Sequence, residues 1–168
     1  MIDVAKLARG RPTVLLMAVT VIVFSVSFLL MPKRLSGLEM YTTSLFAVFF
    51  GLSTDLFLDV KYHLYGYFDV GVDGLAYVFI VFIYVTVNLL FLNGYPMHRP
   101  IWVQAAYIGG WSLFSLLYEM AALRTEIFYY HGWKLSYSAA LYPLLFLILL
   151  WHLLFVRRLA AKAKRRSE

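Results

Sequence analysis

Long apolar stretches alternate with short polar segments along almost the whole chain. A helix needs about 20 mostly apolar residues to cross the hydrocarbon core of a bilayer. Five stretches qualify, so the pattern predicts an all-α, polytopic membrane bundle of about five transmembrane helices in a single domain, 1–168. Pro12 suits the first turn of the first helix, and Pro32 suits its end. The expected spans are 12–31, 41–58, 72–92, 101–123 and 135–156.

The composition agrees with lipid as the surrounding solvent. Of the 168 residues, 62% are hydrophobic, 18% are aromatic and only 14% are charged, and the mean hydropathy is +0.77. A water-soluble domain of this length buries only about two-thirds of its surface, so this many apolar side chains would leave a large sticky exterior. The chain has no cysteine, which excludes disulfides, thiolate metal sites and cysteine catalysis.

The charges indicate how the helices are oriented. The net charge is +6, and many of the cations lie in the tail 157–168, RRLAAKAKRRSE. A basic tail of this kind favours a cytoplasmic C-terminus beside anionic lipid headgroups, and not a nucleic-acid partner. With five spans the N-terminus would lie outside, although Lys6, Arg9 and Arg11 argue against that side. A re-entrant second segment would place both termini inside, and this alternative stays open.

Acidic residues gather at helix ends that share one side of the membrane when consecutive spans alternate in direction. Asp55 and Asp59 end the second span, Asp73 begins the third and Glu119 ends the fourth. Tyr137 begins the fifth span on the same side. A carboxylate within a span is costly, so it normally faces the bundle interior and has a partner or a function. We therefore expect an acidic, aromatic-rich pocket on the extracytoplasmic side, opposite the basic tail.

This pocket is suited to a cationic or polar group. The expected ligand-binding residues are Asp55, Asp59, Asp73, Tyr77, Tyr84, Glu119 and Tyr137. The candidates for a metal ion are Asp55, Asp59 and His63, which follow one another at intervals of four residues and offer the hard oxygens that magnesium, calcium or manganese prefer. A simpler alternative is that Asp55 or Glu119 pairs with Lys61, Arg124 or tyrosine hydroxyls and only holds the helices together.

The sequence favours binding or assembly over catalysis. It contains no G-x-S-x-G, H-E-x-x-H or phosphate-loop motif, and it does not identify a cofactor. The expected partners are membrane lipids and either another membrane protein or a second copy of the chain. The alternative functions are a scaffold subunit of a cell-envelope complex, a small solute or ion carrier, and a lipid-modifying intramembrane enzyme.

Two segments resemble a known group of proteins. The pairing of TDLFLD...HLYGYF with LYEMAAL...FYYHGWKLSYSAALYP resembles small multi-pass membrane proteins of spore-forming Gram-positive bacteria, a family of conserved hypothetical proteins. The resemblance covers roughly residues 41–156 and implies a bacterial plasma membrane, about four to five helices and no known activity. The positions that match are Asp55 or Asp59, Tyr67, Glu119, Trp133 and Tyr137.

The segment FFGLSTDLFLD is also similar to the rod-shape-determining membrane subunit of the cell-wall elongation machinery. In that family a G-x3-D pattern ends a helix before a glycine-containing turn, as Gly51, Asp55 and Gly66 do here. This resemblance implies a scaffold role. The long loop 59–72 and the acid at Glu119 depart from the family pattern.

Overall fold

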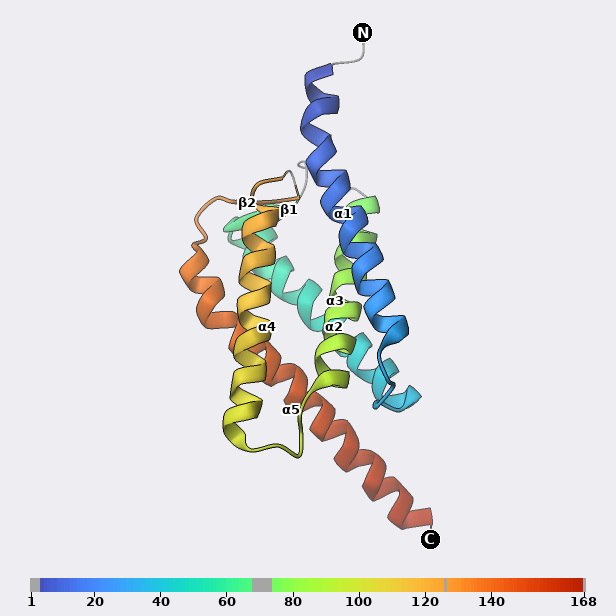
Figure 1. Cartoon of the computed structure of the whole chain (residues 1–168). Helices are drawn as coiled ribbons and strands as arrows, with labels where there is room; N and C mark the ends of the chain where they lie inside the picture. The colour runs from blue at the N-terminus through green and yellow to red at the C-terminus, as the bar shows by residue number, and fades with distance from the viewer. Residues whose placement is uncertain (1–3, 68–73, 126, 168) are drawn as a thin grey trace.

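The computed structural model describes residues 4–67, 74–125 and 127–167 (Figure 1). The helices are α1 (Val4–Leu30), α2 (Gly37–Asp55), the π-helix η1 (Leu56–Lys61), α3 (Gly74–Gly94), α4 (Ile101–Ala122) and α5 (Leu135–Ser167). The two strands are β1 (Tyr65–Tyr67) and β2 (Phe128–Tyr130). The predicted all-α class is confirmed, with a short two-stranded ribbon added to it. Asp73, one of the expected binding residues, lies outside the described residues.

Four helical segments in the described part of the chain are long and apolar enough to cross a membrane: Pro12–Leu30, Gly37–Lys61, Tyr77–Gly94 and Leu135–Arg166. The expected fourth span, 101–123, forms the 22-residue helix α4. This helix carries Gln104, Ser112 and Glu119, and it is not among the four segments. The two chain ends lie at opposite ends of the molecule, and the basic end of α5 extends past the other helices (Figure 1).

The helix ends follow from local sequence. Helix α1 stops at Leu30, just before Pro32. At its other end it begins at Val4, so Pro12 lies inside the helix and not in its first turn. The preceding residues are mostly good helix formers. Helix α2 starts with a capping box, in which Ser36 and Glu39 bond each other's backbone N–H groups at 3.3 and 2.7 Å.

The end of α2 is wound differently from the rest of the helix. After Asp55 the chain continues as a π-helix to Lys61. His63 then adopts a left-handed backbone conformation with φ 51°, which ends the helical path. Local π-helical turns inside α-helices are rare and often lie at functional sites. Here the π-helix directly follows Asp55, one of the expected binding residues.

The helices pack around two clusters of buried apolar side chains. Helix α2 lies against α3 and α5, α1 lies against α3, and α4 lies against α5. Phe91 of α3 and Leu153 of α5 are completely buried in the first cluster. A second buried cluster combines Tyr65 and Phe128 of the two strands with Phe79 of α3. Buried apolar side chains therefore fill both the middle of the bundle and its ribbon end.

Strands β1 and β2 join two connections that are far apart in the sequence. They are antiparallel, and Tyr65 pairs with Tyr130, Gly66 with Tyr129 and Tyr67 with Phe128. The ribbon thus ties the connection between α2 and α3 to the connection between α4 and α5. Gly66 leaves room for the ring of Tyr129: a Cβ at that position would lie 2.5 Å from the ring, so the ring would have to shift.

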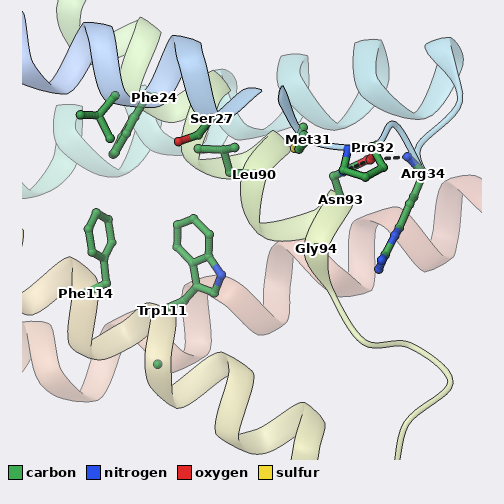
Figure 2. A pocket seen from close by; sticks show the side chains of 12 residues that line it. Phe24, Ser27, Met31, Pro32, Arg34, Leu90, Asn93, Gly94, Trp111 and Phe114 are labelled. Carbon is green, nitrogen blue, oxygen red and sulfur yellow. Dashed lines mark hydrogen bonds between the residues drawn. The ribbon is translucent and has the colours of Figure 1, made fainter. Parts of the chain in front are cut away.

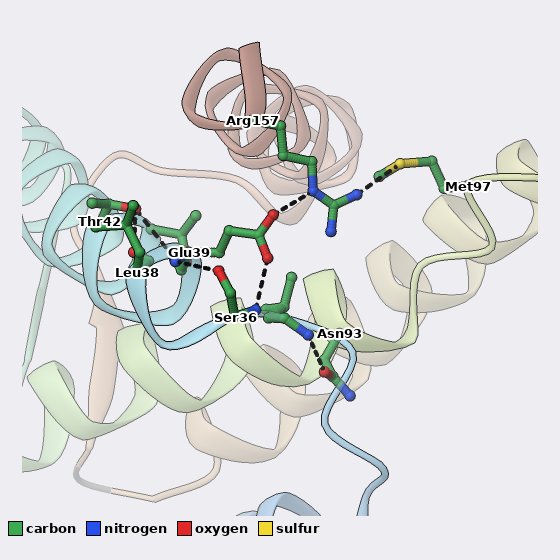
Figure 3. A network of polar contacts seen from close by, with 9 residues as sticks. Ser36, Leu38, Glu39, Thr42, Asn93, Met97 and Arg157 are labelled. Atoms are coloured by element: carbon green, nitrogen blue, oxygen red, sulfur yellow. Dashed lines mark hydrogen bonds and ion pairs between the residues drawn. The ribbon is translucent and has the colours of Figure 1, made fainter. Parts of the chain in front are cut away.

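The opposite end of the bundle is held by a different polar network (Figure 3). The Arg157 guanidinium of α5 donates to Glu39 of α2 at 2.5 Å and to the sulfur of Met97 at 3.0 Å. Asn93 accepts hydrogen bonds from the backbone N–H groups of Arg34 and Leu35 at 2.7 and 3.2 Å. These contacts fix the turn between α1 and α2 against the end of α3.

Candidate functional site

Asp55 is partly buried and accepts three hydrogen bonds from tyrosine hydroxyls. Tyr65 and Tyr67 of β1 donate to Oδ1 at 2.7 and 3.3 Å. Tyr84 of α3 donates to Oδ2. Alternate residues of a strand point to the same face, which explains why Tyr65 and Tyr67 reach one carboxylate. We call these four residues the Asp55 cluster.

The Asp55 cluster depends on the close approach of α2 to α3. Gly51 lies one helical turn before Asp55, and a Cβ on Gly51 would lie 2.7 to 2.9 Å from three carbons of the Tyr84 ring. Such distances are far inside van der Waals contact. The absence of a side chain at Gly51 therefore leaves the space that the Tyr84 ring occupies when its hydroxyl donates to Asp55.

Glu119 has the same kind of surroundings. It is buried, with 6% of its surface exposed. Tyr130 of β2 and Ser138 of α5 donate to Oε1, Ser138 at 2.7 Å, and Tyr142 of α5 donates to Oε2 at 2.9 Å. The indole N–H of Trp133 donates to Ser138 at 2.8 Å. We call Glu119, Tyr130, Ser138 and Tyr142 the Glu119 cluster; Trp133 orients its serine.

The two clusters are adjacent. Tyr65 and Tyr130 are partners across the ribbon, and side chains of directly opposite residues lie on the same face. Each of these two tyrosines donates to one of the acids. Electrostatic interactions also link Tyr142 with Tyr84 and with Asp55. The carboxylates of α2 and α4 thus lie beneath one face of the same ribbon.

Hydroxyl groups, and not cations, satisfy both acids. Within the described ranges the one ion pair is Arg157 with Glu39, at the opposite end of the bundle. Lys61 instead lies over the rings of Phe57 and Tyr62, with its amine 5.6 and 5.2 Å from their centroids. The alternative in which an acid pairs with tyrosine hydroxyls is therefore the one that forms, and pairing with Lys61 or Arg124 is not seen.

The tyrosines of the ribbon remain protonated donors. Burial, then the charge of Asp55 and the hydrogen bond to it, raise the pKa of Tyr65 far above its usual value. Burial and the neighbouring Tyr84 and Asp55 likewise raise the pKa of Tyr67. For Tyr130, burial is followed by the hydrogen bond and charge of Glu119, which raise its pKa as well. A free tyrosine titrates at about 10, so these phenols stay neutral throughout the physiological range.

Three further expected residues, Asp59, Tyr77 and Tyr137, lie outside the two clusters. Asp59 is partly buried in η1. Tyr77 and Tyr137 are 53% and 47% exposed, and Tyr137 packs edge-on against Trp133 with 5.4 Å between ring centroids. Of the seven expected binding residues, the structure brings Asp55 together with Tyr84 and places Glu119 in the neighbouring cluster.

The expected metal ligands are not assembled. Among the described residues, no three His, Asp or Glu side chains gather as they would around a metal ion. The physical reason lies in the local backbone: the helix that would have aligned Asp55, Asp59 and His63 ends at Lys61, and His63 follows it in a left-handed turn. In addition, both oxygens of Asp55 already accept hydrogen bonds.

Sequence reasoning did not identify most of the donors. Tyr65, Tyr130, Ser138 and Tyr142 were not expected to bind a ligand, and Tyr67 entered only through a resemblance. The available signal was the Y-x-Y pattern of residues 65–67, which places two hydroxyls on one face if the segment is extended. A three-residue strand is too short to be predicted from periodicity.

Comparisons with family models, curated proteins and solved structures give no match for this chain. The fold and the site therefore define its class. It is an all-α protein with four described segments able to cross a membrane, and it carries two hydroxyl-lined carboxylates beneath a ribbon at one end of the bundle.

Proposed function

We propose that this chain is a small integral protein of a bacterial plasma membrane and acts by binding or assembly. In this proposal all five long helices span the bilayer, and the basic end of α5 is cytoplasmic. The continuous helical run Gly37–Lys61 supports a full second span over a re-entrant one. Helix α4 is not among the four segments apolar enough to span by composition alone, but its polar residues Ser112 and Glu119 are buried inside the bundle, which lowers the cost of inserting it.

The ribbon end is the proposed binding site for a cationic or polar group, on the extracytoplasmic side. One observation carries this proposal: two carboxylates from separate helices lie under one ribbon face and have only neutral hydroxyl partners among the described residues. A buried carboxylate without a counter-charge is costly. A bound ammonium or guanidinium group would provide that counter-charge, and the tyrosine hydroxyls would rotate to accept hydrogen bonds from it.

The test is a ligand-induced gain in thermal stability of the purified protein in detergent. The probes are spermidine, agmatine and choline, each compared with sodium chloride at equal ionic strength. At least one probe should raise the unfolding temperature of the wild type. The gain should disappear in Asp55→Asn and Glu119→Gln, since each removes a charge beneath the ribbon.

Asp59→Asn is the matched control because it removes one negative charge from the same end of the molecule. Asp59 accepts no hydrogen bond from the ribbon tyrosines in the described structure, so the response should persist in this variant. No stabilisation of the wild type by any probe, or a response lost in Asp59→Asn but kept in Asp55→Asn, would contradict the proposed site.

A carrier is the second candidate, and a structural repetition favours it. Each half contains a helix with an acid near its end, a strand whose tyrosine donates to that acid, and a helix whose tyrosine also donates to it. The halves are α2–β1–α3 and α4–β2–α5. Many carriers are built from repeated units with the substrate site between them. Uptake of the stabilising cation into proteoliposomes, lost in Asp55→Asn, would distinguish transport from binding alone.

A further inference from the structure

A groove of about 630 Å³ lies between α1, α3 and α4, away from the two acid clusters (Figure 2). Its walls are mainly apolar: Phe24 of α1, Leu90 of α3, and Trp111 and Phe114 of α4. This volume falls within the range of about 300–1,000 Å³ that is usual for ligand sites. The groove lies on the flank of the bundle, which in a membrane protein faces lipid.

Aromatic rings line one end of the groove, beside a contact between α1 and α4. Thr20 of α1 and Tyr118 of α4 share a hydrogen bond of 2.9 Å. The rings of Phe24 and Phe114 lie beside this bond, with 6.2 Å between their centroids. Because α1 and α4 meet at this point, a molecule in the groove would have to be apolar at its inner end.

The other end of the groove carries a cation. Figure 2 shows Arg34 at the end of the groove away from Phe24. The backbone N–H of Arg34 donates to Asn93 at 2.7 Å, and Asn93 in turn donates to the carbonyl of Pro32 at 2.7 Å. These bonds hold the backbone at Arg34 in place. Its side chain is exposed, and within the described ranges its guanidinium forms no ion pair.

We propose that this groove binds one acyl chain of an anionic phospholipid and that Arg34 binds the phosphate of its headgroup. An apolar groove that ends at an exposed guanidinium, with no ion pair among the described residues, matches an amphiphile with one negative end. Arginine matches phosphate geometry because its planar guanidinium donates two parallel hydrogen bonds. Lys33 precedes Arg34 in the same turn, and the positive charge of these two residues also favours an anionic headgroup.

Gly110 provides a way to fill the groove without disturbing the fold. It lines the groove, and a Cβ at Gly110 would meet no atom within 4 Å. Gly110→Leu therefore places a side chain in the space proposed for the acyl chain. Gly109→Leu is the matched control: Gly109 is also free of neighbours within 4 Å, it is on the same helix, and it does not line the groove.

The experiment measures lipid retention by native mass spectrometry on the full chain in detergent, with dioleoyl phosphatidylglycerol and dioleoyl phosphatidylcholine as probes. The wild type and Gly109→Leu should retain phosphatidylglycerol, and Gly110→Leu should lose both lipids. Arg34→Gln should weaken retention of phosphatidylglycerol by about fivefold, the effect of one basic residue near an anionic headgroup, and weaken retention of phosphatidylcholine less, because its choline cation offsets the charge of its phosphate. Circular dichroism spectra that match the wild type confirm that each variant is folded.

Several results would overturn the inference. Equal retention of the two lipids by the wild type would remove the role of Arg34, and unchanged retention by Gly110→Leu would place the lipid elsewhere. Competition by inorganic phosphate as strong as that by phosphatidylglycerol would indicate a free-anion site. A dimer that dissociates in Gly110→Leu would indicate that a second copy fills the groove. Flotation of the protein with vesicles tests the proposed membrane location separately.

Discussion

Tyr84 is the residue that connects α3 to the acid of α2. Replacing it by phenylalanine keeps the ring against Gly51 and removes only the donor to Asp55. A buried acceptor that loses a partner costs about 1–3 kcal/mol, so Tyr84→Phe should lower the free energy of unfolding by that amount. The measurement is denaturant or thermal unfolding in detergent.

Tyr77→Phe is the control for this prediction because it makes the same chemical change on the same helix. Tyr77 is 53% exposed, and its substitution should change stability by less than about 0.5 kcal/mol. If both variants unfold like the wild type, the hydrogen bond from Tyr84 does not stabilise the bundle.

Gly51 gives a second prediction, which concerns space and not hydrogen bonding. In Gly51→Ala the new methyl group would overlap the Tyr84 ring, so the ring must shift or α2 must move away from α3. Overpacking of this kind typically costs about 1–3 kcal/mol. Gly109→Ala on α4 has open space around its Cβ, and should be neutral or slightly stabilising because alanine favours helix. If the two variants unfold at the same denaturant concentration or temperature, the contact between Gly51 and the Tyr84 ring does not limit the packing of α2 against α3.

The sequence could identify the acids but not their donors. Asp55 and Glu119 are conspicuous because carboxylates are rare within apolar helices, and the cost of burying them predicts an inward orientation. The donors are mostly tyrosines in an aromatic-rich chain, and apart from the Y-x-Y pattern of residues 65–67 nothing local distinguishes Tyr65 from the exposed Tyr77. The difference arises from the pairing of two strands far apart in the sequence, which is a property of the fold.

Among the elements, the ribbon joins the halves of the bundle, and Gly66 permits its close packing. In Gly66→Val the side chain would collide with Tyr129, so the strands should separate and Tyr65 and Tyr67 should lose their register with Asp55. We expect faster hydrogen exchange in residues 64–67 and 128–131 and a lower unfolding temperature. The reason is that strand pairing and both acid clusters share this register.

Gly132→Ala is the control for the ribbon. A Cβ at Gly132 would lie 3.5 Å from a methyl carbon of Leu64, an ordinary contact, so exchange in the ribbon should stay slow. Equally slow exchange in Gly66→Val would mean that the ribbon tolerates a side chain at this position and does not depend on the glycine.

The helices were predictable because each consists of a long apolar stretch with clear breaks. Pro32 follows the end of α1, and the capping box of Ser36 and Glu39 opens α2. Three features were not predictable in the same way. The start of α1 before Pro12, the π-helix after Asp55 and the ribbon all depend on packing or on weak local preferences, which hydrophobic periodicity does not record.

At the scale of the whole molecule, the two ends of the bundle differ in charge and chemistry. The ribbon end carries carboxylates bonded to hydroxyls. The other end carries the pair of Arg157 with Glu39, the exposed Arg34 and the basic tail. In the proposed orientation, the cation site and the lipid groove lie toward opposite leaflets, with the cation site outside and the anionic headgroup inside.

Sidedness is the prediction that tests this arrangement as a whole. The chain has no cysteine, so single cysteines can be introduced at exposed positions and labelled in intact cells with a membrane-impermeant maleimide. His131→Cys at the ribbon end should be labelled from outside, whereas His98→Cys in the turn between α3 and α4 and Ala161→Cys in α5 should be labelled only after lysis. Five spans require this pattern, because β2 follows α4 and the tail follows α5. Labelling of position 98 in intact cells would invert the orientation and place the acid clusters in the cytoplasm, where an external cation would not reach them.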